Sequence, residues 1–258
     1  MNKEDDIRLD QKVRAAWMYY IAGLNQSEIA SQLGTSRPVV QRLIAAAKDE
    51  GIVSIGLHHP VANCLDYAQL LKEKYQLTDC NIMPVYSIES TLDSVTFGCY
   101  QLMARYLQGD KPTIVGIGSG LTLKKTIKRI DFDSQNTRCV ALISAMNEHG
   151  QCNYYDDVPL LLARKIQGKY YQWPAPRYAQ SREEYKMWST NRLFRNVSTV
   201  ARDSDVIFVG IGALGRQSPI FKDGFIDEQQ LEELTAHGGV GEILGRFIDA
   251  EGNVVESQ

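Results

Sequence analysis

Basic, amide and hydroxyl side chains are concentrated in one short stretch near the N-terminus, residues 35–48. Arginine can donate to guanine O6 and N7, and glutamine can pair with adenine N6 and N7. Serine and threonine hydroxyls at the start of a helix suit phosphate oxygens, because the first N–H groups of a helix attract anions. The stretch therefore has the chemistry to contact a DNA duplex, and the side chains that we expect to do so are Thr35, Ser36, Arg37, Gln41, Arg42 and Lys48.

The elements that would position these side chains form a helix-turn-helix. Apolar periodicity predicts helices over residues 12–22, 26–32 and 36–50, with Asn25 and Ser36 as N-caps of the second and the third. The apolar arc of the third helix, which would pack on the other two, is Val39, Val40, Leu43, Ile44 and Ala47. The remaining arc has three basic residues and no acidic one, and a helix-turn-helix would direct it into the major groove. The alternative is a three-helix bundle that contacts another protein.

Three glycine-rich turns form the second group of candidate residues. They span residues 116–122, 210–216 and 238–242 and lie beside predicted strands. In parallel α/β sheets ligands bind at the carboxyl ends of the strands, where glycines let backbone N–H groups approach an anion. Hydroxyls, a guanidinium and a carboxylate in these turns would suit a phosphorylated sugar or polyol. The residues that we expect to bind it are Gly118, Ser119, Gly120, Leu121, Thr122, Arg216 and Glu242.

These turns lack the spacing of nucleotide-binding and catalytic motifs. Leu121 stands where a dinucleotide-binding GxGxxG motif has its last glycine, and no Gly-Lys-Ser/Thr follows that would make a P-loop. No GxSxG elbow is present, and the four histidines show no metal-ligand spacing. We therefore expect no cofactor, no metal and no catalytic residue, although each turn taken alone would also fit a simple tight turn.

Two domains are predicted, a DNA-binding domain over residues 1–59 and an effector and oligomerisation domain over residues 60–258. In the second domain helices alternate with strands, which predicts a parallel sheet with helices on both faces. The expected strands lie near residues 80–86, 112–117, 138–143, 205–211 and 243–248, and the expected helices near 64–74, 91–107, 120–129, 157–166, 189–202 and 227–236. Residues 52–57 predict a further short strand after the third helix. The stretches 146–157 and 172–188 are expected to decide which ligand binds.

Composition limits the class of protein. The 258 residues are 44% hydrophobic and 23% charged, which are ordinary globular values. No run of about 18 apolar residues occurs, so we expect no membrane span. Five scattered cysteines without a CxxC pair indicate reduced thiols and a cytoplasmic location. The net charge of -3 belongs to the second domain, since the basic and acidic residues of the first domain cancel.

Three blocks of sequence resemble the SorC family of sugar-responsive bacterial transcriptional regulators. The first block is residues 13–53, the second is 114–123, and the third is the pair 205–212 and 238–249. The resemblance implies a winged helix-turn-helix and a Rossmann-like effector domain similar to sugar-phosphate isomerases and glucosamine-phosphate deaminases. It also implies homodimers or homotetramers that bind double-stranded operator DNA with an affinity set by a small sugar or phosphosugar.

The resemblance also assigns roles to single residues. By motif matching, residues 119–122 fall on the turn that cradles phosphate, and Arg216 and Glu242 fall at positions that commonly touch the effector. The related deaminases have Asp-Gly-His where this chain has Leu214-Gly215-Arg216, which favours binding over catalysis. Family members continue with a strand–helix–strand segment that adds a glycine turn and a lysine to the pocket. We expect this chain, which stops at Gln258, to lack that segment.

The sequence therefore predicts a DNA-binding transcriptional regulator of carbohydrate catabolism whose operator affinity depends on a sugar or phosphosugar. The alternative is a sugar-phosphate isomerase-like or deaminase-like enzyme with an accessory DNA-binding arm. A third hypothesis is a constitutive DNA binder whose sensor no longer binds a ligand.

Overall fold

The computed structural model describes residues 3–55, 59–147, 149–152 and 158–255. The chain divides into two units, an N-terminal unit (Met1–Ala62) and a C-terminal unit (Asn63–Gln258). None of the helices in the described ranges is both long and apolar enough to cross a membrane.

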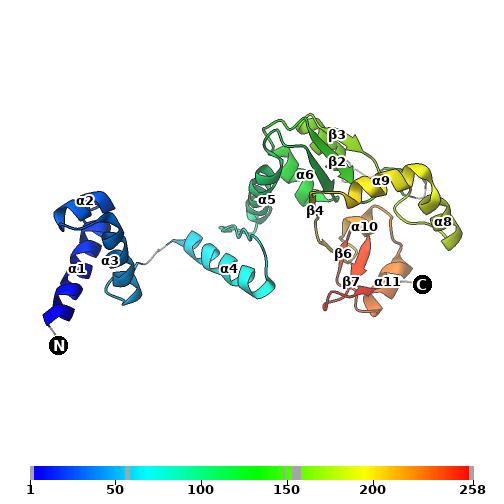
Figure 1. Ribbon diagram of the computed structural model, residues 1–258. Coiled ribbons are helices and arrows are strands. Elements are labelled where there is room, and N and C mark those ends of the chain that lie inside the picture. The colour runs from blue at the N-terminus through cyan, green and yellow to red at the C-terminus, as the bar shows by residue number, and fades with distance from the viewer. Residues whose placement is uncertain (1–2, 56–58, 148, 153–157, 256–258) are drawn as a thin grey trace. The chain divides into compact units, whose positions relative to one another are not determined.

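The N-terminal unit is built from three helices, as predicted. They are α1 (Lys3–Tyr20), α2 (Gln26–Gln32) and α3 (Arg37–Asp49), shown in blue in Figure 1. Helix α1 begins earlier than the sequence pattern indicated, because its first turns are polar and have no apolar periodicity. The three helices enclose one small core, which consists of Ala15, Ile29, Ala30, Val40 and Ile44.

A hydrogen-bonded cap fixes the turn between α1 and α2. The Asn25 side chain accepts hydrogen bonds from the N–H groups of Ser27 and Glu28 at 3.0 and 3.1 Å, and Glu28 Oε2 accepts one from the Asn25 N–H at 2.7 Å. This reciprocal capping box confirms the predicted cap of α2 and satisfies N–H groups that the helix itself leaves unbonded. Gly34 has a φ of +60°, a conformation that glycine adopts at little cost.

The strand predicted after α3 is wrong over the residues that the structure describes. Residues 51–55 form a turn and bends, and residues 56 and 57 lie outside the described residues. The Val53 N–H donates to the Ala47 carbonyl oxygen at 3.1 Å, so the chain folds back on the end of α3 instead of extending. The winged form of the helix-turn-helix is therefore not seen in residues 51–55.

The C-terminal unit contains the predicted parallel sheet. Its strand order is β3-β2-β1-β4, and all three pairings are parallel. The strands are β1 (Thr113–Ile117), β2 (Thr137–Ala141), β3 (Lys169–Tyr171) and β4 (Val206–Phe208). All five residues of β1 are buried, as expected for a central strand covered on both faces.

Helices cover both faces of this sheet (Figure 1). On one face a core of Met103, Leu123, Ile127 and Leu162 comes from α5 (Thr91–Leu107), α6 (Leu121–Lys128) and α7 (Val158–Lys165). On the other face Val197 of α9 (Arg192–Arg202) packs on Ile114 and Val140. The unit also contains α8 (Arg182–Thr190) and all but the first three residues of α4 (Pro60–Tyr75).

A second, antiparallel sheet follows and corrects the prediction of a single strand over 243–248. Its order is β5-β6-β7-β8, and its strands are β5 (Gly212–Ala213), β6 (Gly241–Ile243), β7 (Arg246–Ile248) and β8 (Val254–Val255). Leu244 and Gly245 have φ values of 52° and 81°, so they form a tight hairpin between β6 and β7. Helices α10 (Pro219–Lys222) and α11 (Glu228–Ala236) accompany this sheet, and their Ile220, Leu231 and Leu234 form a core with Phe247.

The strand predicted over 80–86 is also wrong. These residues have no strand pairing, and they pack along α5 instead. Asn81 Nδ2 donates to the Gly98 carbonyl oxygen at 3.3 Å, and a Cβ atom at position 98 would lie 2.6 Å from Met83 Cγ. Asn81 and Met83 therefore pack on a helix, whereas Val85 and Tyr86 are exposed.

Candidate functional site

Helix α3 separates its apolar and polar side chains as predicted. Val40, Ile44 and Ala47 are buried, and Val39 and Leu43 are half-buried. Five of the six side chains that we expect to contact DNA are exposed, and the sixth, Thr35, is half-buried. The exposed ones are Ser36, Arg37, Gln41, Arg42 and Lys48.

The N-terminus of α3 is open to an incoming group. Ser36 occupies the N-cap position, but its hydroxyl makes no capping hydrogen bond to the helix. Its carbonyl oxygen accepts from the N–H groups of Val39 and Val40 at 3.0 and 3.1 Å. Arg37 Nε lies 3.4 Å from Gln26 Oε1, so α2 orients the first side chain of α3. A helix terminus with this geometry can bind a phosphate oxygen through its first N–H groups.

Two acidic side chains of the N-terminal unit are held in ion pairs with basic side chains of α1. Glu50, at the end of α3, pairs with Lys12 of α1 at 2.5 Å, and Asp10 pairs with Arg14 at 2.7 Å. In the described part of the N-terminal unit no ion pair involves Arg42 or Lys48. The basic side chains of α3 thus remain available to a polyanion.

A cleft of about 270 Å³ lies in the C-terminal unit at the carboxyl ends of β1 and β4. The turn after β1 and the start of α6 contribute one part of its lining, and the chain after β4 contributes another. Strand β6 and the segment around α10 complete it. Its polar and charged lining residues are Ser119, Thr122, Arg177, Ser218, Asp223 and Glu242. The carboxyl ends of neighbouring parallel strands are where this class of fold binds ligands.

The start of α6 presents backbone donors to the cleft. Gly120 is its N-cap with a φ of 118°, which side chains rarely tolerate, and no side chain caps the helix. Leu121 and Thr122 follow as the first helical residues, so their N–H groups have no partner within the helix. The partial positive charge of these groups favours an anion.

Glu242 presents an oriented carboxylate from β6. Its Oε1 accepts a hydrogen bond from the Gly245 N–H across the tight hairpin. Gly212 of β5 lies opposite, and a Cβ atom there would lie 3.0 Å from Glu242 Oε2. A larger residue at position 212 would therefore push the carboxylate away from its present place. A carboxylate held in this way is suited to accept hydrogen bonds from sugar hydroxyls.

The structure places some of the predicted ligand-binding residues in the lining of the cleft and others outside it. Residues 119–122 and Glu242 line the cleft together. Gly118 is buried below it, where its N–H donates to the Phe208 carbonyl oxygen at 2.9 Å and joins β1 to β4. Arg216 is not among the lining residues, because its exposed guanidinium pairs with Glu228, with Nε at 2.8 Å from Oε1.

Sequence reasoning did not single out three polar lining residues, Arg177, Ser218 and Asp223. Arg177 lies within residues 172–188, a stretch expected to decide which ligand binds. The residues around it match no motif that would have singled it out. Ser218 and Asp223 flank α10, a helix too short to give a periodic pattern. Part of the other expected stretch, residues 148 and 153–157, lies outside the described residues.

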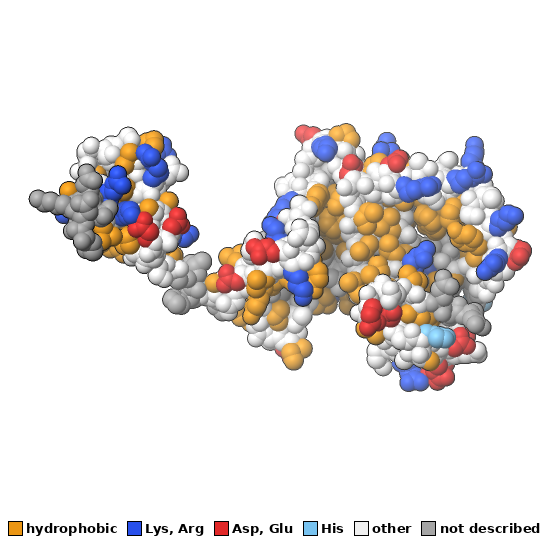
Figure 2. Space-filling model, turned by 60° about the horizontal axis from the view of Figure 1, so that its bottom comes forward, with side chains coloured by type: hydrophobic (Ala, Val, Ile, Leu, Met, Phe, Trp, Pro, Cys, Tyr) orange, Lys and Arg blue, Asp and Glu red, His pale blue; other side chains and the backbone are white. Residues whose placement is uncertain are grey.

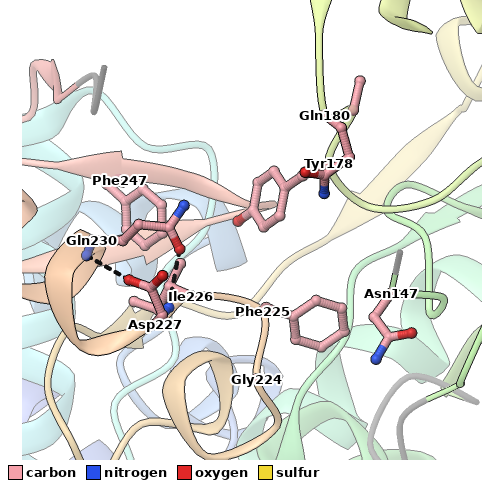
Figure 3. A pocket seen from close by; sticks show the side chains of 10 residues that line it. Asn147, Tyr178, Gln180, Gly224, Phe225, Ile226, Asp227, Gln230 and Phe247 are labelled. Atoms are coloured by element: carbon pink, nitrogen blue, oxygen red, sulfur yellow. Dashed lines mark hydrogen bonds between the residues drawn. The ribbon is translucent and has the colours of Figure 1, made fainter. Parts of the chain in front are cut away.

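A neighbouring pocket of about 580 Å³ is less suited to specific binding (Figure 3). Phe225 and Asn147 lie on one side of it and Tyr178 and Gln180 on another. Its Asp227 and Gln230 are occupied with each other, because they form the capping box of α11 with bonds of 2.8 and 3.0 Å. The smaller cleft is therefore the stronger candidate site.

The described residues include no group of three or more His, Cys, Asp or Glu side chains that could hold a metal ion.

Comparison with known proteins places the chain in a family. A family model described as "Putative sugar-binding domain" matches residues 59–258. The chain belongs to this family. The match agrees with the resemblance to SorC-type regulators and confirms it.

Relatives in this family are named as regulators. The chain is 29% identical over 247 residues to the erythritol catabolism regulatory protein EryD of Brucella abortus, covering 95% of this chain and 78% of EryD. It is 29% identical over 254 residues to the transcriptional regulator LsrR of Escherichia coli K12, covering 95% of this chain and 76% of LsrR.

Solved structures show the same fold. The full-length sorbitol operon regulator SorC from Klebsiella pneumoniae matches with a TM-score of 0.65 and 24% identity, covering 97% of this chain and 80% of SorC. A DeoR family transcriptional regulator from Listeria monocytogenes matches with a TM-score of 0.66 and 21% identity, covering 76% of this chain and 77% of that chain. The α/β architecture with a parallel sheet is therefore the one found in regulators of this type.

Proposed function

We propose that this protein is a sugar-responsive transcriptional regulator that binds double-stranded operator DNA through α3 and a small sugar or phosphosugar through the cleft of its C-terminal unit. The observation that carries the proposal is the combination of two sites in one chain. One is a helix with an exposed basic face, and the other is a cleft with backbone donors and an oriented carboxylate, within a domain that matches a sugar-binding family.

The DNA site of the proposal is residues 35–48. Arg37, Gln41 and Arg42 would contact base edges from the first turns of α3. Thr35 and Ser36 would contact phosphate at the helix start, and Lys48 would add charge further along. Neutralised phosphates release counterions, so binding through this surface would weaken steeply with salt.

The ligand site of the proposal combines the α6 start with Glu242. The N–H groups of Leu121 and Thr122 and the hydroxyls of Ser119 and Thr122 would bind an anionic or hydroxyl oxygen. Glu242 would accept from ligand hydroxyls. Gly118 would not contact the ligand itself but would hold the turn after β1 against β4. We propose binding rather than catalysis, because this chain has Leu214-Gly215-Arg216 where the related deaminases have Asp-Gly-His.

We also propose that the protein acts as a homodimer or homotetramer in the cytoplasm. The C-terminal unit leaves large apolar side chains exposed, among them Ile88, Ile207 and Ile211 at 90%, 51% and 75%. Figure 2 shows hydrophobic side chains in orange gathered over the middle of one of its faces, with basic and acidic side chains around them. Apolar patches of this kind are typical of association surfaces. Two-fold symmetry would place two α3 helices on half-sites about 34 Å apart.

Thermal unfolding with a ligand panel tests the ligand half of this proposal. The full chain is heated alone and with sugars and polyols of four to six carbons, each in free and phosphorylated form. A compound that binds the folded state raises the unfolding temperature in proportion to its saturation. Stabilisation by at least one member supports the proposal. Turnover of any member by the purified protein would support the enzyme alternative instead.

A further inference from the structure

The outer face of α9 in the C-terminal unit carries three exposed arginines, Arg192, Arg195 and Arg202. We propose that this face binds the phosphate backbone of duplex DNA, as a second contact in addition to α3. The inference rests on the proposed DNA binding. It gives the C-terminal unit a part in the affinity for the duplex but none in the choice of base sequence, because phosphate contacts carry no sequence information directly.

The side chains of α9 divide into an apolar arc and a polar arc at the helical period of about 100° per residue. The apolar arc packs on the parallel sheet, where Val197 is buried against Ile114 and Val140 (Figure 1). The rings of Phe194 and Trp173 extend this contact, with their centres 4.8 Å apart. The polar arc therefore faces away from the sheet, and its members, all exposed, are Arg192, Arg195, Asn196, Thr199 and Arg202.

The positive charge of this face is not neutralised by ion pairs. Residues 185–202 include four basic residues and no Asp or Glu, in a chain whose net charge is -3. Within the described ranges no ion pair involves an arginine of α9. The carboxylate nearest to Arg202 along the chain belongs to Asp203, the exposed C-cap of the helix. Clustered charge of one sign creates a local potential, which here attracts a polyanion.

Backbone carbonyls orient two of the three guanidinium groups. Arg195 donates from Nε and Nη2 to the Thr190 carbonyl oxygen at 3.1 and 2.5 Å. Arg202 donates from Nε to the Ser198 carbonyl oxygen at 3.3 Å. A guanidinium has five N–H donors, so both side chains retain donors that can bind a phosphate oxygen.

The length and composition of the face favour a duplex over another protein. The helix rises about 15 Å from Arg192 to Arg202, and each DNA strand carries a phosphate about every 3.4 Å along the axis, so the face can contact more than one phosphate. Arginine, asparagine and threonine side chains commonly donate to phosphate oxygens. The centre of a protein–protein interface is instead apolar and poor in charge, and the polar arc of α9 has no apolar member.

The test measures how DNA binding by the full chain depends on salt. Fluorescence anisotropy gives the Kd of wild type and of the double variant Arg192→Gln, Arg202→Gln between about 50 and 200 mM salt. The probes are a duplex selected from a random library with the full chain and a scrambled duplex of the same length. The slope of log Kd against log salt is expected to fall by about 2, or about 1 for each lost phosphate contact. The affinities for the two duplexes are expected to fall by the same factor.

Two single variants separate this role from a loss of folding. Arg105→Gln is the matched control, because Arg105 is an exposed arginine of the same unit that pairs with Asp79, and it is expected to bind DNA as wild type does. Asp203→Asn removes the carboxylate next to Arg202. It is expected to tighten binding about 1.5- to 5-fold, the usual effect of one exposed charge pair, and a damaged fold would not produce such a gain.

Three outcomes decide between the inference and its alternatives. An unchanged salt slope in the double variant, or no gain in Asp203→Asn, overturns the inference. A changed oligomeric state in light scattering with an unchanged slope assigns the face to an acidic protein surface and overturns it too. If wild type binds no duplex, the proposed DNA binding fails and the inference fails with it. If only the Arg37→Ala, Arg42→Ala variant binds as wild type does, the proposed role of α3 fails while that of α9 stands.

Discussion

The phenolic hydroxyl of Tyr178 donates a hydrogen bond to the backbone carbonyl of Gly245 at 3.0 Å. This bond joins the segment that follows β3 to the β6–β7 hairpin, and the hairpin holds Glu242 through the N–H of the same glycine. The parallel sheet and the antiparallel sheet of the C-terminal unit are thus linked beside the cleft.

Tyr178→Phe is expected to destabilise the C-terminal unit by about 0.5–1.5 kcal/mol, because the Gly245 carbonyl loses its donor. It is also expected to weaken ligand binding, since the hairpin that orients Glu242 is less restrained. Urea unfolding and calorimetry measure the two effects. An unchanged unfolding free energy would show that water replaces the hydroxyl at no cost.

Tyr178 also gives the unfolding free energy a dependence on alkaline pH. Burial raises the pKa of Tyr178 from its ordinary value of 10.0 to about 12. The raised pKa means that the folded state holds the phenolic proton more tightly, so this contribution is complete below pH 10 and is lost as the pH rises to 12. The stability difference between wild type and Tyr178→Phe should therefore shrink over pH 10–12, and a constant difference would contradict this.

Replacing Arg37 and Arg42 together by alanine is expected to lower the affinity for a duplex selected from a random library. Each lost base contact should cost about 1–3 kcal/mol. Arg14→Ala is the matched control, because Arg14 is an exposed arginine of the same unit that pairs with Asp10. Fluorescence anisotropy measures both, and equal losses in the two variants would contradict a specific role for α3.

Core substitutions should separate the two units. Ile29→Ala empties part of the small N-terminal core, where Ile29 is fully buried, and should cost about 2–5 kcal/mol. DNA binding should be lost while ligand binding remains. Leu162→Ala, in the core of the C-terminal unit, should instead abolish ligand binding. Loss of both activities in both variants would show that the units do not fold independently.

The cysteines should differ in reactivity. Cys139 lies in the core under the sheet, where burial raises the pKa of its thiol from 9.0 to about 12, whereas Cys152 is exposed. Only a thiolate reacts with iodoacetamide, so at pH 8 the folded protein should be labelled at Cys152 and protected at Cys139. Mass spectrometry of peptides identifies the labelled positions. Fast labelling of Cys139 would contradict the packing of this core.

The N-terminal helices could be predicted because their signals are local. Asn25 and Glu28 have the spacing of a capping box, and the apolar arc of α3 repeats at the helical period. Strands β1 and β2, which are longer and largely buried, were predicted equally well. The sequence also predicted residues 119–122 and Glu242 as parts of one site, since each follows or begins a strand beside glycines.

The parts that could not be predicted depend on distant contacts. Strands β3, β5 and β8 have two or three residues each, which is too short for an alternating pattern. The hairpin at Leu244 requires a non-glycine residue in a left-handed conformation, so it has no ordinary turn signal. Arg177 lines the cleft, and its side chain contacts Ser144 and Phe225, which are far away in the chain.

The measurement that tests the central claim most directly is DNA binding with and without ligand. The full chain is titrated onto the selected duplex by fluorescence anisotropy, alone and with a saturating amount of the compound that stabilises it most. If the cleft controls α3, the apparent Kd should change about 5- to 150-fold, the usual range of coupling between sites. The Arg37→Ala, Arg42→Ala double variant should bind weakly in both conditions. An apparent Kd that is the same with and without every stabilising compound would contradict the account.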